Sequence, residues 1–222
     1  MNSKALVSEF VGTFALIFIG VGAIAANHIT GGTLGLTGIA LAHGLAIACM
    51  VTATAAVSGG HLNPAVTLGL LSIGKINAPS ALKYILAQCA GAVAAAFALK
   101  VCVPEGMLSV VGWGTPAVNV TAGVTPIMAL VTEIVLTFFL VYVVYGSAVD
   151  KSAPKMGGLF IGLTVALDIT MGGAISGAAM NPARHLGPAL VGGNMSNIWI
   201  YWLGPVLGAI LAAQVAERTL KT

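Results

Sequence analysis

Six apolar stretches dominate the chain of 222 residues, and each has about the 20 residues that a helix needs to cross the hydrocarbon core of a bilayer. Only 7% of the residues are charged, too few to cover the surface of a soluble domain. The net charge of +3 comes from a scarcity of charged residues and not from a basic patch, so a nucleic-acid-binding protein is also disfavoured. We therefore predict an all-α integral membrane protein with six transmembrane helices, at residues 4–26, 36–57, 81–103, 124–149, 156–174 and 198–217.

The few basic residues predict how these spans are oriented. Lys and Arg flank membrane spans mainly on the cytoplasmic side. With the N-terminus inside, seven of the nine basic residues fall on that side, and an even number of spans returns the C-terminus to it. We expect a multi-pass protein of the cell membrane with both termini in the cytoplasm and with its cytoplasmic charges at Lys4, Lys75, Lys83, Lys151, Lys155, Arg218 and Lys221.

The three cysteines, Cys49, Cys89 and Cys102, lie among apolar residues and show no C-x-x-C spacing. An odd number of cysteines with such surroundings does not indicate a disulfide framework or a metal site. We predict that they are small core residues, and we expect neither a metal nor a cofactor.

An internal repeat relates the two halves of the chain. Residues 44–69 and 162–187 align without a gap at an offset of 118, and they share a Ser-Gly pair and an Asn-Pro-Ala tripeptide. We predict one channel domain over residues 1–222, with repeats at about 4–103 and 124–217. Because each repeat holds three spans, the second enters the membrane from the opposite side, and such inverted repeats place a functional site near the midplane.

Each Asn-Pro-Ala tripeptide follows a span and precedes a short apolar segment that cannot cross the membrane. Asn is a favourable N-cap, and Pro is favourable in the first turn of a helix. Pro64 and Pro182 are therefore predicted to begin two re-entrant half-helices. Irregular backbone at membrane depth is tolerated inside protein or along a water-filled cavity, so residues 58–62 and 175–180 are expected to line a pore.

We call these two Asn-Pro-Ala tripeptides the boxes. Two boxes in an inverted six-span duplication strongly resemble the aquaporin, or major intrinsic protein, family over essentially the whole chain. The resemblance implies six transmembrane helices with two half-helices, one pore in each subunit, a homotetramer in the lipid bilayer and no cofactor. The pore residues that it implies at the boxes are Asn63, Pro64, Ala65, Asn181, Pro182 and Ala183.

The resemblance also implies a selectivity filter near the outer mouth. Arg184, directly after the second box, would supply a fixed positive charge, and His43, Ile169 and Ala178 fall at the other three filter positions. This combination is similar to that of the plant tonoplast-intrinsic type. Ile169 in place of a histidine makes the expected filter wider and less polar on one side than a strict water filter.

Two acidic residues, Glu9 and Glu133, lie inside predicted spans at equivalent positions of the repeat. Acids at membrane depth are paired or functional. The resemblance implies that they accept hydrogen bonds from the loops that carry the boxes; a proton relay is the alternative. His61 is expected to brace the first of these loops. The symmetry-related pairs Gly44 with Gly162 and Gly91 with Gly208 are expected to allow close helix crossings.

His185 and Asp168 depart from the family pattern. His185 stands where water-type members have a small polar residue, and Asp168 is an acid next to a filter position. We hypothesise that the two side chains pair and stiffen the outer mouth.

The sequence therefore predicts a passive channel that conducts water in single file and excludes protons and ions, because two half-helix N-termini present positive ends to the lumen. The alternative is a broader channel for neutral solutes such as ammonia, glycerol or urea. A secondary transporter is also compatible with inverted repeats, although few acids are available for a coupling ion. An enzyme is not expected, since no nucleophile motif was found.

Overall fold

The computed structural model describes residues 3–150, 152–153 and 156–221, and it is all-helical, with no β-strand in these ranges. Two of the basic residues used above for orientation, Lys151 and Lys155, lie outside the described residues. The long helices are α1 (Ser3–Ile29), α2 (Gly35–Ser58), α4 (Ala78–Cys102), α6 (Pro126–Val144, extended by a π-helical turn Tyr145–Val149), α7 (Gly157–Gly172) and α9 (Ile198–Thr219).

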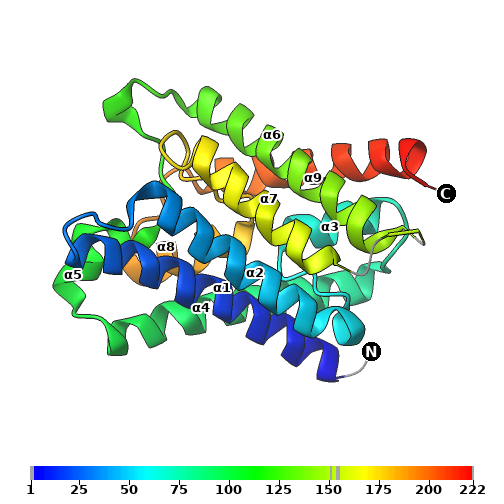
Figure 1. The fold of residues 1–222 in the computed structure, drawn as a ribbon, viewed down its shortest axis with the longest axis horizontal. Helices are drawn as coiled ribbons and strands as arrows, with labels where there is room; N and C mark the ends of the chain where they lie inside the picture. Colours follow the sequence, from blue (N-terminus) through cyan, green and yellow to red (C-terminus); the bar gives the residue numbers. More distant parts are fainter. Residues whose placement is uncertain (1–2, 151, 154–155, 222) are drawn as a thin grey trace.

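The long helices form one bundle, in which α1 packs on α2 and α4, α2 packs on α7, and α6 packs on α9. Helix α1 begins and helix α9 ends at the same end of this bundle (Figure 1). The connection between α4 and α6 contains the short helix α5 (Glu105–Val110) at the other end, followed by the 3-10 turns Gly112–Gly114 and Val120–Ala122.

Five of the six predicted spans are helices long and apolar enough to cross a membrane, which confirms a multi-pass membrane protein. The sixth differs, because α7 has only 16 residues. At 1.5 Å per residue it is about 24 Å long, short of the roughly 30 Å hydrocarbon core. Helix α7 ends at Gly172, where the backbone turns and the N–H groups of Ile175 and Ser176 bond to the Gly172 carbonyl.

Glycines set the closest helix crossings, as predicted. A Cβ added to Gly44 or Gly162 would lie less than 3.0 Å from the other glycine's carbonyl oxygen, so α2 and α7 touch through their backbones. Gly91 and Gly208 make equivalent crossings, with the carbonyls of Phe10 on α1 and Ile134 on α6. Because real Cβ atoms do not come so close, any side chain at these four positions would push the helices apart.

Two short helices, α3 (Pro64–Ser72) and α8 (Pro182–Gly192), begin at the prolines of the two boxes. The Asn63 side chain accepts a hydrogen bond from the N–H of Ala65 at 2.8 Å, and Asn181 accepts one from Ala183 at 3.0 Å. Each asparagine is therefore a true N-cap. Helix α3 packs on α9 and α8 packs on α4, so each half-helix is held largely by other helices of the bundle.

An ionic cluster joins three segments at the end of the bundle where α9 ends. Glu217 on α9 accepts hydrogen bonds from Lys221 at 2.7 Å and from the Tyr145 hydroxyl at 2.6 Å, and it lies 3.4 Å from Lys75. The bond to Glu217 raises the pKa of Lys221. The cluster ties the loop after α3 to the ends of α6 and α9.

The prediction for the cysteines is wrong at two positions. Cys49 on α2 and Cys102 at the end of α4 are exposed on the outside of the bundle, and Cys89 is half-buried. All three are free thiols, as expected. Helices in lipid have apolar residues on all faces, so apolar neighbours in the sequence do not distinguish the core from the lipid-facing surface.

Candidate transmembrane pore

A buried glutamate holds the loop that precedes the first box. Glu9 on α1 accepts hydrogen bonds from the Ser58 hydroxyl at 2.6 Å and from the backbone N–H groups of His61 and Leu62 at 3.0 and 2.6 Å. The side-chain amide of Gln88 on α4 adds a fourth bond at 2.8 Å. A carboxylate has enough acceptor sites for all of these donors, which would otherwise be buried without partners.

The second loop is held in the same way. Glu133 on α6 accepts hydrogen bonds from the Ser176 hydroxyl at 2.7 Å and from the N–H groups of Ala179 and Met180 at 2.9 and 2.7 Å. The Tyr201 hydroxyl donates to the Ser176 carbonyl at 2.8 Å, just as Tyr84 donates to the Ser58 carbonyl. The internal repeat is therefore also a repeat of the hydrogen-bond network.

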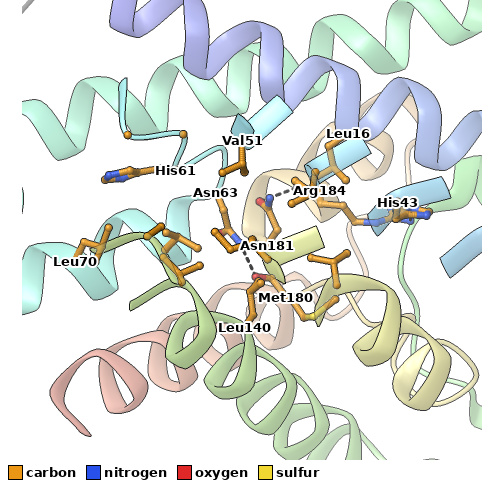
Figure 2. Close-up of a pocket in the computed structure, with 18 of the residues that line it drawn as sticks. Leu16, His43, Val51, His61, Asn63, Leu70, Leu140, Met180, Asn181 and Arg184 are labelled. Carbon is orange, nitrogen blue, oxygen red and sulfur yellow. Dashed lines mark hydrogen bonds between the residues drawn. The ribbon is translucent and has the colours of Figure 1, made fainter. Parts of the chain in front are cut away.

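The two boxes meet through reciprocal hydrogen bonds. The side-chain amide of Asn63 donates to the carbonyl of Met180 at 2.9 Å, and that of Asn181 donates to the carbonyl of Leu62 at 3.0 Å. The N-termini of α3 and α8 thus lie tip to tip (Figure 2). Each amide carries two N–H bonds, so one donor remains on each asparagine for another acceptor.

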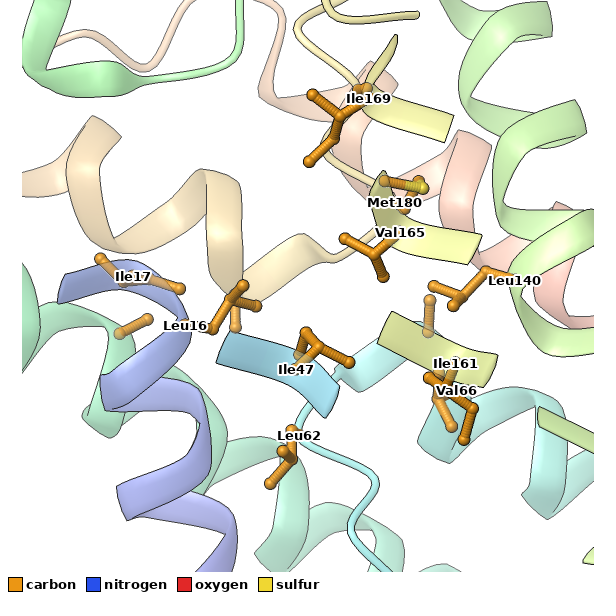
Figure 3. Packing of buried hydrophobic residues seen from close by; sticks show 14 of the residues in the cluster. Leu16, Ile17, Ile47, Leu62, Val66, Leu140, Ile161, Val165, Ile169 and Met180 are labelled. Atoms are coloured by element: carbon orange, nitrogen blue, oxygen red, sulfur yellow. The ribbon is translucent and has the colours of Figure 1, made fainter. Parts of the chain in front are cut away.

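A cavity runs past this meeting point through the middle of the bundle. Asn63 and Asn181 line it, and so do Gly60 and His61 of one loop and Ala178 of the other. Much of the remaining wall is formed by aliphatic side chains, several of which are drawn in Figure 3; they include Leu16, Ile47, Val66, Leu140, Ile161 and Val165. At the end where α9 ends, the cavity reaches Lys75 and Val149.

A second cavity opens at the opposite end, beside residues 114–119. The two cavities share three lining residues, His43, Ile169 and Arg184. Three of the four predicted filter residues therefore mark the boundary between the inner and outer cavities. The fourth, Ala178, lines the inner cavity, and its neighbour Gly177 lines the outer one.

His43 and Arg184 are joined at this boundary by a hydrogen bond of 3.1 Å between His43 Nε2 and Arg184 Nη2. Arginine can only donate, so Nε2 is the acceptor. His43 Nδ1 lies 2.9 Å from the carbonyl of Ile39, which can only accept, so Nδ1 carries the proton. The ring is therefore neutral and both of its nitrogens are occupied.

Arg184 is also held from the outer loop, because its Nη1 donates to the carbonyl of Gly114 at 2.6 Å. The side chain is buried and, within the described part of the chain, it forms no ion pair with a carboxylate. It therefore places a positive charge with no carboxylate in direct contact at the boundary of the two cavities. The sequence gives no sign of the Gly114 contact, since a carbonyl acceptor from a distant loop has no residue signature.

The side chain of His61 contacts α3 and α4. Its Nδ1 lies 3.1 Å from the Thr67 hydroxyl of α3, and its ring packs edge-on against Tyr84, with the centroids 5.2 Å apart. The same ring also borders the cavity. His61 thus joins its loop to α3 and α4 and also lines the cavity, and its bracing role stays a prediction.

The hypothesis that Asp168 pairs with His185 is wrong. Both ring nitrogens of His185 and the Oδ2 oxygen of Asp168 are buried without a hydrogen-bond partner among the described residues, and no ion pair joins the two side chains. His185 is instead stacked on Tyr201 of α9, with the ring centroids 4.2 Å apart. It is fully buried against α9, whereas Asp168 belongs to α7, so closeness to the filter in sequence does not bring the two together.

Two half-helices that approach from opposite ends and meet tip to tip beside a cavity define a membrane channel fold (Figure 1). The chain matches the family model described as Major intrinsic protein over residues 1–215, and it belongs to that family. Members of this family are channels, so the protein is an integral membrane channel and not an enzyme.

The chain is similar to several known proteins. Aquaporin TIP4-4 of Zea mays is 42% identical, over 96% of this chain and 85% of that protein. A probable TIP-type aquaporin of Antirrhinum majus is 44% identical, over 94% of this chain and 84% of the relative. The X-ray structure of the aquaglyceroporin from Plasmodium falciparum has a TM-score of 0.89 at 26% identity, covering 98% of this chain and 96% of that chain.

Proposed function

We propose that the protein is a passive channel that conducts water in single file through this cavity and excludes protons and ions. The observation that carries the proposal is the pair of boxes, where Asn63 and Asn181 each line the cavity and each keep one unshared N–H donor. A water that accepts both hydrogen bonds points its own hydrogens away from the boxes. A chain of waters that could pass a proton is then interrupted.

The backbone of the two loops beside the cavity supports this path. The carbonyl oxygens of Gly60, His61, Ala178 and Ala179 accept no hydrogen bond from any residue that the structure describes, and all four residues line the cavity. They provide acceptors for the hydrogens of passing water on both sides of the boxes. The opposite wall is aliphatic, so a water there can be held from one side only.

Charge supports the exclusion of cations. The N-termini of α3 and α8 direct their positive dipole ends to the middle of the cavity. Arg184 adds its positive charge at the boundary between the two cavities. We propose that Arg184, His43, Ile169 and Ala178 act together as the selectivity filter.

A broader channel for ammonia, glycerol or urea is the second candidate. It is favoured by Ile169 and Ala178, which present no polar side-chain atom, and by His43, whose two nitrogens are already bonded. Arg184 is therefore the one proposed filter residue whose side chain can donate hydrogen bonds to a solute. The relatives named above as aquaporins support water, while the filter composition leaves room for larger neutral solutes.

Light scattering from proteoliposomes tests both candidates. Shrinkage in an impermeant osmolyte reports water, and re-swelling in glycerol or urea reports the solute. The water channel predicts shrinkage much faster than in protein-free liposomes and a low activation energy, near that of diffusion in water. A steep temperature dependence, or saturable and ion-dependent uptake, would indicate a transport cycle in place of a passive pore.

We further propose that residues 1–222 form a single channel domain, that both termini face the cytoplasm, and that four copies assemble into a homotetramer with one pore each. The relatives of the TIP type do not favour the cell membrane that we expected from the sequence. Lys4, Arg218 and Lys221 support the orientation because they lie near the ends of α1 and α9. Protease protection of terminal tags tests the orientation. Light scattering coupled to size-exclusion chromatography tests the tetramer.

A further inference from the structure

A notch in helix α1 receives the ring of His43. The notch is formed by Gly20, which is buried on the face of α1 that packs on α2. A Cβ built on Gly20 would lie 2.5 Å from His43 Cδ2, 2.8 Å from Cε1 and closer still to Nε2. All three of the nearest atoms belong to this one ring, so the space that a side chain at position 20 would need is already occupied by the filter histidine.

From this contact we propose that Gly20 is a positioning residue that sets the width and the polarity of the filter. The inference rests on the proposed channel function and adds a residue to it that does not line either cavity. Carbon atoms pack at about 3.5–4.0 Å, so a methyl group at position 20 would displace the ring by about 1 Å. An imidazole is rigid, so it must move as a unit.

The direction of this movement follows from the surroundings of the ring. Gly20 lies on one side of His43, and both cavities border the ring elsewhere. A ring pushed away from α1 therefore enters the boundary between the cavities. The shift would also break the 3.1 Å bond between His43 Nε2 and Arg184 Nη2, and Arg184 would keep only its bond to Gly114.

Helix α1 offers a matched control. Gly22 lies on the same helix, but a Cβ there would meet a single atom, Leu99 Cδ2, at 3.9 Å, which is an ordinary van der Waals distance. Gly22→Ala therefore changes the same residue type in the same helix without touching the filter.

Proteoliposomes that contain Gly20→Ala, Gly22→Ala, His43→Ala or the double variant Gly20→Ala/His43→Ala test the proposal. Because pore width controls passage, we expect Gly20→Ala to lower water permeability per protein about tenfold. Gly22→Ala should match the wild type, and the double variant should recover at least the wild-type permeability. Equal permeability in the two single glycine variants would overturn the proposal.

Thermal unfolding in detergent separates this inference from the proposed function. A collision between residue 20 and the ring predicts that Gly20→Ala lowers the Tm in the presence of His43 and much less in its absence. If Gly20→Ala does not fold, recovery of folding in the double variant supports the notch, and failure of both variants overturns it. If the wild type conducts no water, the proposed function fails, and the Tm comparison still decides the notch.

Discussion

Leu62 and Met180 occupy equivalent positions in the two repeats, and each has a backbone φ of 51°. A left-handed conformation in a residue with a branched or long side chain costs about 1–3 kcal/mol. Both residues are held in it from two sides. A buried glutamate accepts from the N–H, and the asparagine of the opposite box donates to the carbonyl. These hydrogen bonds thus hold the strained backbone in place at the point where the two half-helices meet.

Removing one acceptor should weaken this arrangement. Glu133→Gln replaces one carboxylate oxygen by an amide donor, which then faces either the N–H of Met180 or the N–H of Ala179 together with the Ser176 hydroxyl. A buried donor without a partner costs about 1–3 kcal/mol, so we expect a clear fall in the Tm measured in detergent. Glu105→Gln is the control, because Glu105 forms an exposed ion pair with Lys100, and such pairs contribute about 0–1 kcal/mol. Equal Tm values for the two variants would contradict the bracing role.

The crossing of α2 and α7 should be sensitive to a single methyl group. In Gly162→Ala the new Cβ overlaps the Gly44 carbonyl, which is backbone and cannot turn aside. Overpacking of this kind costs about 1–3 kcal/mol, which the Tm of the purified protein would report. Gly106→Ala in α5 meets no atom within 4 Å and is expected to be neutral or slightly stabilising. A Tm for Gly162→Ala at or above the wild-type value would show that the helices can separate freely.

The proposed filter should open when its two polar side chains are removed. Arg184→Val together with His43→Ala should raise glycerol and proton leak while water flux is kept. The fixed charge and the ring are lost, and the boxes are unchanged. Glycerol re-swelling and a pH-sensitive dye trapped in proteoliposomes measure the two leaks. Leu45→Ala, on the exposed face of α2, serves as the control. Unchanged glycerol and proton leaks in the double variant would show that other residues form the filter.

Mercurials should have little effect on the wild-type protein. None of the three cysteines, all of which the structure describes, lines either cavity, whereas Ala178 of the proposed filter lines the inner one. Ala178→Cys should therefore make water flux sensitive to Hg²⁺, and a thiol reductant should restore the flux. Cys49→Ser should leave the response of the wild type unchanged. Strong wild-type inhibition that disappears in Cys89→Ser would place that half-buried thiol in the water path.

His185 should be replaceable by an apolar ring. Neither of its nitrogens has a partner among the described residues, so His185→Phe loses no hydrogen bond and keeps the stack on Tyr201. A swap of similar volume costs less than about 1.5 kcal/mol. Tyr201→Phe, in contrast, removes the bond to the Ser176 carbonyl and should lower the Tm more. A large loss of stability in His185→Phe alone would indicate a polar partner for the imidazole.

The parts of this fold that the sequence predicts are those with a local signature. Apolar length predicts the spans, and Asn followed by Pro predicts the starts of α3 and α8. The short length of α7 is harder to predict, because the helix ends at Gly172 in a turn and the apolar stretch of the sequence continues past it. The helix-crossing glycines can be predicted from the repeat alone, because glycine occurs at equivalent positions in both halves of the chain.

The candidate site shows the same division. The roles of His43 and Arg184 remain predictions, and their positions are those that the resemblance to the family implies. The partners of these residues do not, since Gly20 and the Gly114 carbonyl come from segments that show no pattern. The pairing of Asp168 with His185 failed for a related reason. Sequence distance from the filter does not specify which helix face a polar side chain occupies.

The reciprocal bonds between the boxes make the two halves of the chain equivalent to the subunits of a two-fold dimer that share one covalent chain. In such an interface, residue i of one partner contacts residue j of the other, and j contacts i in return. Asn63 completes the loop of the second half, and Asn181 completes that of the first. Neither half contains all the acceptors and donors of its own loop, so two half-chains would have to associate before either could form its box.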